Sequence, residues 1–507
     1  MGKPRQTARG VFWTWIALAF GFGVTFFMTP FIVHRLGVTT YGVWALVVSA
    51  TSYLGLLDLG LRGAVVRFVS RAHVLGNHEE SSRAVSGALW LRQWIGLTIF
   101  VLSVSLAFLI DRFFAIPVET LNAARWAVGL SGLGLGMALF FGVFSGVLAA
   151  LQRFDLIGEI SIAQTILRAA GVVWVLKNRF GILGLGVLEL TLAIVIGLAQ
   201  TYVCFATYPE LRVSLSFPGK DILKSFASYG VWVFLVHIFG QVIYFTDNLV
   251  VGAFVSVAAV TFYSIGGSLI EYLRTVIASL TQTFMPLASK YETAGEAEKL
   301  RLLLINGTQA ALIIALPIQA ALFFRGQTFL NLWMGPQYGS ISGRVLQILL
   351  LGQVFTMANG TSINISFGLS KHKRFALWLA GEALANLTLS IFLARRIGLY
   401  GVALGTVIPT LFVQLILWPR YISQVVGVPV WHYIYQGWVR PVLAVIPFGV
   451  ACYFSDCYWP ATALMGFFSQ IAAFLPVYLV FVTLVFWSEI VRLFKLRTKW
   501  VSGYSGV

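Results

Sequence analysis

The sequence predicts an all-α polytopic membrane protein with about fourteen transmembrane helices, arranged as two six-helix lobes plus two C-terminal helices. Three observations support this fold class. Apolar segments of membrane-spanning length follow one another from Val11 to Trp487. The loops between them are too short to fold on their own. Hydrophobic residues make up 59% of the chain and charged residues only 10%, too few to cover a soluble protein of this length.

The individual spans are read from hydropathy, because a helix that crosses a bilayer needs about 20 mostly apolar residues. Lipid offers no hydrogen-bond partner to the backbone, so runs of this length are expected to be helical. The predicted spans are 11–33, 40–61, 86–110, 124–148, 156–176, 182–206, 226–250, 255–280, 302–324, 344–367, 375–394, 399–418, 438–455 and 462–487.

The basic residues of the loops predict the orientation. About 22 Lys and Arg residues lie in one set of loops and about 8 in the opposite set, and the richer set is expected to be cytoplasmic. Both termini are then cytoplasmic. Two segments of the cytoplasmic loops, AVVRFVSRAHVL (64–75) and AGEAEKLRLLL (294–304), are expected to form amphipathic helices along the membrane interface.

A faint internal repeat predicts the domain organisation. The segment that starts FMTPFIVHRLG at Phe27 has a counterpart that starts YFTDNLVVGAF at Tyr244, about six spans later. An even offset starts both copies on the same side, which predicts a parallel repeat about an axis along the membrane normal, with a central cavity between the lobes. The expected divisions are an N-terminal lobe at 1–207, a C-terminal lobe at 208–420, and two extra spans with a basic cytoplasmic tail at 421–507.

Composition and motifs exclude several functions. The net charge of +17 is assigned to loops that bind anionic head groups, and nucleic-acid binding is not expected, because no soluble basic domain is present. The sequence has no P-loop, no HExxH and no GxSxG motif. Cys204, Cys452 and Cys457 do not form a metal-binding pattern. We therefore predict no catalytic residues, no metal and no cofactor.

Ionisable residues inside predicted spans are the candidates for function, because each needs a partner or a wet cavity. Asp58 and Arg62 are four residues apart, and Glu271 and Arg274 three apart in the corresponding second-lobe helix, so each pair is placed to neutralise itself on one helix face. The alternative is that both pairs face the substrate. Asp247 is a candidate for binding a coupling cation, although a structural cap or ion pair is the commoner role for such a residue.

Several short segments, taken together, resemble the polysaccharide-exporting flippases of the multidrug/oligosaccharidyl-lipid/polysaccharide exporter superfamily. In the first lobe these are Pro30, the turn Arg35–Leu36–Gly37, the pair Tyr41–Gly42, the step Asp58–Leu59–Gly60 and the basic loop that follows. In the second lobe they are FTDNLVVG and FMPLASKY. The resemblance covers essentially the whole chain in span count and length.

This resemblance implies a flippase of the bacterial inner membrane that works by alternating access and serves surface polysaccharide synthesis. The implied substrate is an oligosaccharide linked through pyrophosphate to a polyprenyl lipid. A gradient of Na⁺ or H⁺, or the membrane potential, would drive it. Membrane lipids, a polysaccharide polymerase and chain-length machinery would be its partners.

Arg92 and Arg168 are the strongest candidates for binding the pyrophosphate, because neither has an acid at helical spacing. Arg62 and Arg274 would add to a cationic cavity, and Asp58, Asp247 and Glu271 are the acidic candidates for coupling or structure. The competing interpretation is that Arg92 and Arg168 pair across helices with Glu159, Glu189 or Glu382.

Two other functions compete with the flippase. The first is an ion-coupled drug or metabolite antiporter of the same superfamily, which for cationic drugs should have an acidic site. The second is a membrane-embedded polysaccharide polymerase or glycosyltransferase, which needs a longer loop for its catalytic residues than any loop found here.

Overall fold

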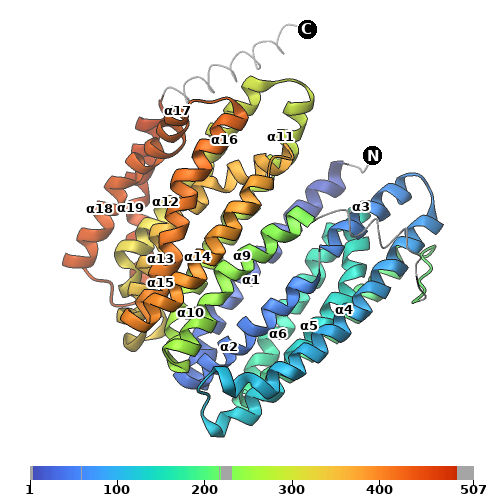
Figure 1. Ribbon diagram of the computed structural model, residues 1–507. Coiled ribbons are helices and arrows are strands. Elements are labelled where there is room, and N and C mark those ends of the chain that lie inside the picture. The colour runs from blue at the N-terminus through green and yellow to red at the C-terminus, as the bar shows by residue number, and fades with distance from the viewer. Residues whose placement is uncertain (1–3, 59, 216, 218–230, 488–507) are drawn as a thin grey trace. The chain divides into compact units, whose positions relative to one another are not determined.

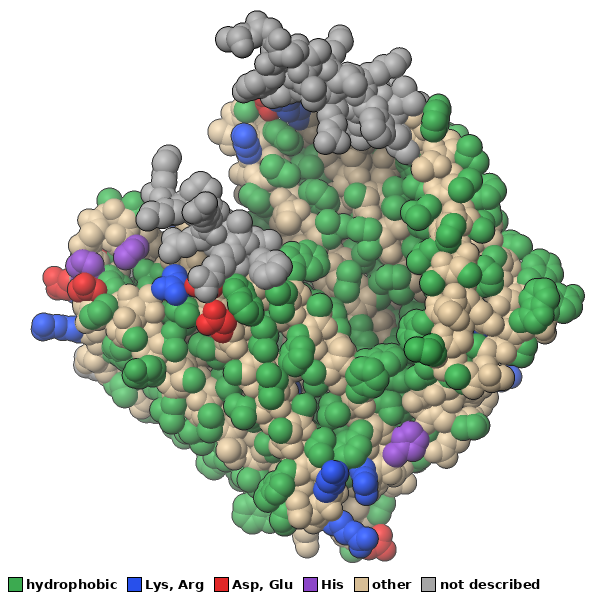
Figure 2. Space-filling model, turned by 180° about the vertical axis from the view of Figure 1, so that it is seen from behind, with side chains coloured by type: hydrophobic (Ala, Val, Ile, Leu, Met, Phe, Trp, Pro, Cys, Tyr) green, Lys and Arg blue, Asp and Glu red, His purple; other side chains and the backbone are tan. Residues whose placement is uncertain are grey.

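The computed structural model describes residues 4–58, 60–215, 217 and 231–487, and the predicted all-α membrane fold is confirmed. No strand occurs in these ranges. Among the described residues, twelve helices are long and apolar enough to cross a membrane. The two remaining predicted spans, 226–250 and 255–280, fall on α9 (Val231–Phe254) and α10 (Val257–Thr281) over their described residues. Hydrophobic side chains are spread over the whole face shown in Figure 2, and most of the charged side chains in view lie toward its edges.

The chain divides into two compact units, Met1–Thr261 and Phe262–Val507. These units are defined by internal packing, whereas the predicted lobes 1–207 and 208–420 and the addition 421–507 are defined by the sequence repeat. The predicted lobes therefore stay a prediction, and each unit is described by itself below.

The first unit is a bundle in which α5 packs against both α4 and α7, α1 packs against α6, and α2 packs against α9 (Figure 1). Besides α9 and the start of α10, its helices are α1 (Pro4–Leu36), α2 (Val38–Leu54), the 3-10 helix η1 (Gly55–Asp58), α3 (Leu61–Val74), α4 (His78–Phe113), α5 (Val118–Ala150), α6 (Phe154–Lys177) and α7 (Gly181–Thr207).

The second unit is held together chiefly by α12, which packs against α13, α18 and α19. Besides the rest of α10, its helices are α11 (Phe284–Thr293), α12 (Ala297–Met334), α13 (Pro336–Gly368), α14 (Lys373–Ile397), α15 (Leu399–Leu411), the π-helix η2 (Phe412–Leu417), α16 (Trp418–Val426), α17 (Val430–Ile434), the π-helix η3 (Tyr435–Val439), α18 (Arg440–Tyr458) and α19 (Leu464–Val485).

One of the two predictions of an interface helix is wrong. The first segment, 64–75, forms most of α3, a separate short helix. The second, 294–304, does not form a helix of its own, because α12 begins at Ala297 and continues without interruption to Met334. The short helix of this region is α11, which lies just before that segment.

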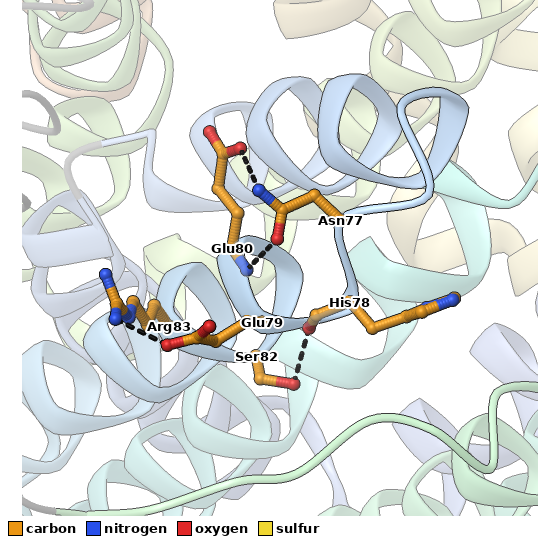
Figure 3. Close-up of polar contacts among 6 residues, drawn as sticks. All are labelled: Asn77, His78, Glu79, Glu80, Ser82 and Arg83. Carbon is orange, nitrogen blue, oxygen red and sulfur yellow. Dashed lines mark hydrogen bonds and ion pairs between the residues drawn. The ribbon is translucent and has the colours of Figure 1, made fainter.

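The start of α4 shows how sequence signals fix the turn that follows α3. Asn77 caps the helix, since its side-chain oxygen accepts a hydrogen bond from the backbone N–H of Glu80 at 3.0 Å (Figure 3). The Asn77 amide also donates to the Glu80 carboxylate at 3.2 Å. Glu79 and Arg83 pair one helical turn apart on the exposed face. This turn connects α3 to α4, and both helices contribute residues to the cavity described below.

Candidate functional site

The first unit contains a polar cavity of about 340 Å³. Its walls come from η1, α3, α4, α5, α6 and α7. The charged residues come from η1, α3 and α4, a hydroxyl from α5, and one amide each from α6 and α7. The lining residues are Asp58, Arg62, Arg92, Ala138, Leu139, Phe141, Gly142, Ser145, Gln164, Ala193, Ile196, Gly197 and Gln200. Three of the seven candidate residues from the sequence, Asp58, Arg62 and Arg92, are thus brought together.

Arg92 lies in the wall of the cavity with its guanidinium already bonded. The side chain is only 2% exposed, and its Nη2 contacts Asp58 Oδ1 at 2.5 Å. Its Nη1 donates to the backbone oxygen of Leu139 on α5. Arg92 is therefore partnered across helices, as the competing interpretation held, but the partner is Asp58 and not one of the three glutamates named for it.

The predicted pairing of Asp58 with Arg62 on one helix face is wrong, because the two residues do not share a helix. The 3-10 helix η1 ends at Asp58, and α3 starts only at Leu61. Between them Gly60 has a φ of 71°, a left-handed conformation that breaks the helix and that glycine adopts without steric cost. The break turns Asp58 toward α4 and leaves Arg62 without this carboxylate.

Arg62 has the most freedom of the three charged groups. Its side chain is exposed, and it donates a long hydrogen bond of 3.3 Å to the hydroxyl of Ser145. The helix beneath it is fixed, because Leu61, Val65 and Val69 of α3 are buried against α4 and α5. A rigid helix therefore presents a guanidinium to a cavity whose carboxylate is bonded to another arginine.

Arg168 and Glu189 form an ion pair between α6 and α7, with 2.7 Å between Nη2 and Oε2. This confirms the competing interpretation for Arg168. Their side chains are 50% and 29% exposed, and neither lines the cavity. Both nevertheless lie one helical turn from it on the same side, since Arg168 follows Gln164 by four residues and Glu189 precedes Ala193 by four.

The other candidates lie elsewhere. Glu271 and Arg274 form the expected ion pair within α10, at 2.5 Å, in the part of that helix that belongs to the second unit. Asp247 is buried on α9, next to Thr246, whose hydroxyl contacts that of Tyr53 on α2. Asp247 is not among the residues that line the cavity.

Sequence reasoning missed Ser145, Gln164 and Gln200, which supply the neutral polar groups of the cavity. A search for charged residues inside spans does not find them. Amide side chains within the apolar spans of α6 and α7 were the available signal, since polar side chains inside a membrane are also expensive to leave without partners.

Several buried polar residues of the second unit are hydrogen-bonded to one another between helices. Glu382 on α14 is 3% exposed and accepts hydrogen bonds from Thr410 at 2.8 Å and from Gln414 at 3.4 Å. Gln414 in turn accepts from Asn359 of α13 at 3.1 Å. The tryptophan that follows η2, Trp418, donates to Ser362 at 2.8 Å. These bonds join α13, α14, α15 and α16 through buried side chains.

A second network attaches the two C-terminal helices to α12. Arg325 is fully buried and contacts Asp456 of α18 at 3.3 Å and Gln470 of α19 at 2.6 Å. Its guanidinium also lies 4.9 Å from the centre of the Phe467 ring. Within the described part of the chain, no cluster of three or more His, Cys, Asp or Glu residues is placed to hold a metal ion.

Comparison with known proteins gives consistent results. Residues 32–343 match the family model described as "Polysaccharide biosynthesis protein". The chain is 25% identical over 437 residues to the uncharacterized membrane protein EpsK of Bacillus subtilis, covering 83% of each chain. It is 22% identical to a putative O-antigen transporter of Shigella flexneri, covering 76% of this chain and 91% of that protein. A probable flippase, AglR of Haloferax volcanii, is also 22% identical over 67% of this chain and 68% of its own length.

Solved structures show the same fold at low sequence identity. The lipid II flippase MurJ in an inward closed conformation superposes with a TM-score of 0.71 at 15% identity, covering 95% of this chain and 99% of its own. An inward-facing multidrug resistance transporter of the MATE family gives a TM-score of 0.70 at 16% identity, covering 80% and 94%. These similarities establish the fold alone.

Proposed function

The chain belongs to the polysaccharide biosynthesis protein family, and from this we propose that it is a flippase for a polyprenyl-pyrophosphate-linked oligosaccharide. It is a multi-pass membrane protein of a family of transporters and flippases, not of enzymes. In our proposal it works by alternating access in the bacterial inner membrane, with both termini cytoplasmic, and delivers the lipid-linked glycan for surface polysaccharide synthesis.

The observation that carries the substrate proposal is the unequal state of the two arginines in the cavity. Arg92 is bonded to Asp58. Arg62 is exposed in the same cavity and has a long contact with a neutral hydroxyl. A guanidinium placed between membrane helices needs an anion or water, and its planar donors match the oxygens of a phosphate.

The roles of Arg62 and Arg92 in this proposal differ from those predicted from their spacing in the sequence. Arg62 becomes the pyrophosphate-binding residue, and Arg92 becomes a positioning residue that holds Asp58 away from Arg62. Were Asp58 free, it would compete with the substrate for Arg62. Arg168 and Arg274 already have carboxylate partners and are second choices for the same role.

Energy coupling and partners complete the proposal. A Na⁺ or H⁺ gradient or the membrane potential would drive the cycle, with Asp58, Asp247 and Glu271 as the acidic candidates. Membrane lipids surround the protein, and a polysaccharide polymerase and chain-length machinery would receive the product. The alternative is an ion-coupled drug or metabolite antiporter, which the shared fold allows. A guanidinium whose only bond among the described residues is to a neutral hydroxyl in the cavity favours an anionic substrate over a cationic drug.

The test compares Arg62→Ala and Arg62→Lys with Arg71→Ala, a control that removes an exposed arginine from the same helix outside the cavity. Binding of a short-chain isoprenyl pyrophosphate to the purified protein in nanodiscs is measured beside glycan export in cells. We expect Arg62→Ala to weaken binding by about tenfold or more, because a charge-assisted hydrogen bond contributes roughly 1.5–3 kcal/mol.

Arg62→Lys should be intermediate, because lysine keeps the charge and loses the fork of donors. Arg71→Ala should bind and export normally. Normal pyrophosphate binding by Arg62→Ala would remove the anion site from this cavity, and binding of a cationic drug in its place would support the antiporter.

A further inference from the structure

Two glutamines line the cavity with their hydrogen-bonding capacity unused. Gln164 on α6 and Gln200 on α7 are both partly buried, and both contribute to the same cavity as Arg62. Neither side-chain amide has a hydrogen-bond partner within the described part of the chain. Both amides line the cavity without a protein partner among the described residues, so they are open to bind water or a ligand there.

An aromatic ring also lines this cavity. Phe141 of α5 lies against the backbone of α7 at Gly197, where an added Cβ atom would fall 2.2 Å from the ring. Only glycine lets the ring approach this closely. Gly197 and Gln200 are three residues apart and so share one face of α7. The ring and the Gln200 amide therefore belong to the same side of the cavity.

Two side-chain amides and an aromatic ring together are suited to binding a sugar. Each glutamine amide has an oxygen that accepts and a nitrogen that donates, and a sugar hydroxyl also does both. Two amides from different helices can thus bind hydroxyls of one ring, while the apolar face of the ring packs on an aromatic side chain. A lipid tail would leave both amides without partners, and a second phosphate would be drawn to a cation and not to neutral amides.

Resting on the proposed function, we propose that Gln164, Gln200 and Phe141 form a subsite for the sugar attached directly to the pyrophosphate. The anion site at Arg62 and this wall share one cavity, so a phosphate held by the arginine places its own sugar against the amides. A volume of about 340 Å³ is at the small end of ligand sites, which span roughly 300–1,000 Å³. The subsite therefore takes the linkage and one sugar, and the rest of the glycan lies outside it.

The experiment uses two probes, citronellyl pyrophosphate and citronellyl pyrophosphate linked to a single sugar. The sugar is varied among glucose, galactose, N-acetylglucosamine and N-acetylgalactosamine. Affinities are measured with the full chain in nanodiscs for the native protein, Gln164→Leu, Gln200→Leu and Gln93→Leu. Leucine is close to glutamine in size and removes only the polar groups. Gln93 is exposed on α4 and does not line the cavity, so it is the matched control.

In the native protein we expect at least one sugar-bearing probe to bind more tightly than citronellyl pyrophosphate. Each of Gln164→Leu and Gln200→Leu should reduce that gain about three- to tenfold, the range for one neutral hydrogen bond, and leave the affinity for citronellyl pyrophosphate unchanged. Gln93→Leu should change neither affinity. Gel-filtration profiles show whether each variant is folded.

The results separate the two proposals. The subsite is overturned when no sugar adds affinity, when the gain survives both leucine variants, or when those variants weaken both probes equally. The anion site is tested independently by citronellyl pyrophosphate on Arg62→Ala. If that variant binds this probe normally, the proposed function fails, whatever the glutamine variants do.

Discussion

The two units treat charge inside the bundle in different ways. In the first unit, Asp58, Arg62 and Arg92 line a cavity, and Arg62 keeps donors to spare. In the second unit, Arg325 and Glu382 are 0% and 3% exposed and are held between helices by side-chain hydrogen bonds. Burial of a charged residue is therefore not in itself evidence of a binding site. Charged residues in a structural hydrogen-bond network are buried at least as deeply as those that line the cavity.

The two units differ in what their side-chain hydrogen bonds connect. The Arg325 and Glu382 networks each join three or more helices, so their bonds hold the second unit together. The Asp58–Arg92 pair holds one side of a cavity in place and leaves Arg62 available. Substitutions in the second unit should therefore act on stability, and substitutions in the first on binding.

The largest effect is expected from Arg325→Leu. It leaves Asp456 and Gln470 without the group that they bind, and breaking a buried ion pair costs roughly 3–5 kcal/mol. The free energy of unfolding of the purified protein measures this loss. Arg325→Leu combined with Asp456→Leu should recover part of it. Weaker binding of citronellyl pyrophosphate by the folded variant would contradict the division between the units.

Arg92→Leu should cost less, about 1.5–3 kcal/mol. It removes contacts to Asp58 and to one backbone oxygen, whereas Arg325 bonds to a second side chain and also lies against an aromatic ring. The effect of Arg92→Leu on binding is more informative. Asp58, now free, should attract Arg62 and weaken pyrophosphate binding, and adding Asp58→Asn should restore that binding. Without such a rescue, Arg92 would have to contact the anion itself, and its assignment as a positioning residue would be wrong.

Glu382→Gln is expected to cost about 1 kcal/mol. The amide keeps one acceptor, but its NH₂ group then faces one of the two donors, Thr410 and Gln414, that now bond to the carboxylate. Thermal unfolding measures the change. Affinity for citronellyl pyrophosphate should not move. A change in that affinity without a change in stability would mean that the second unit contributes to the anion site.

The smallest effect is expected at the ion pair between α6 and α7. Arg168→Gln and Glu189→Gln form a double-mutant cycle, and the coupling energy of a hydrated, half-exposed pair should be about 0.2–1 kcal/mol. A value above roughly 2 kcal/mol would show that this pair lies in a dry environment. It would then belong with the structural networks of the second unit and not beside the cavity.

Much of the fold could be predicted from the sequence, because apolar runs of fixed length have one structural outcome in lipid. The candidate site was predicted in part. Asp58, Arg62 and Arg92 were found because charge inside a span is conspicuous, but their pairing was not. That pairing depends on the backbone break at Gly60, and the contact between Asp58 and Arg92 joins residues 34 positions apart. Helical spacing carries no information about such contacts.

The neutral part of the site was missed for a related reason. Gln164 and Gln200 come from different helices and share a cavity only because α6 and α7 pack together. The correction to the segment 294–304 has another cause. Its charged and apolar residues are amphipathic in pattern. Gly295, with a φ of 68°, lies in the break before Ala297, but nothing after Ala297 ends a helix, so α12 runs from there into the span.

The π-helix η2 decides which face of the following helix meets α13. A π turn holds one residue more than an α turn. Because each residue advances an α-helix by about 100°, the same residues wound as a regular α-helix would rotate every position after Leu417. Trp418 would then turn away from Ser362, its partner at 2.8 Å. The wide turn therefore sets the rotation of α16 about its own axis, and with it the contact between α16 and α13.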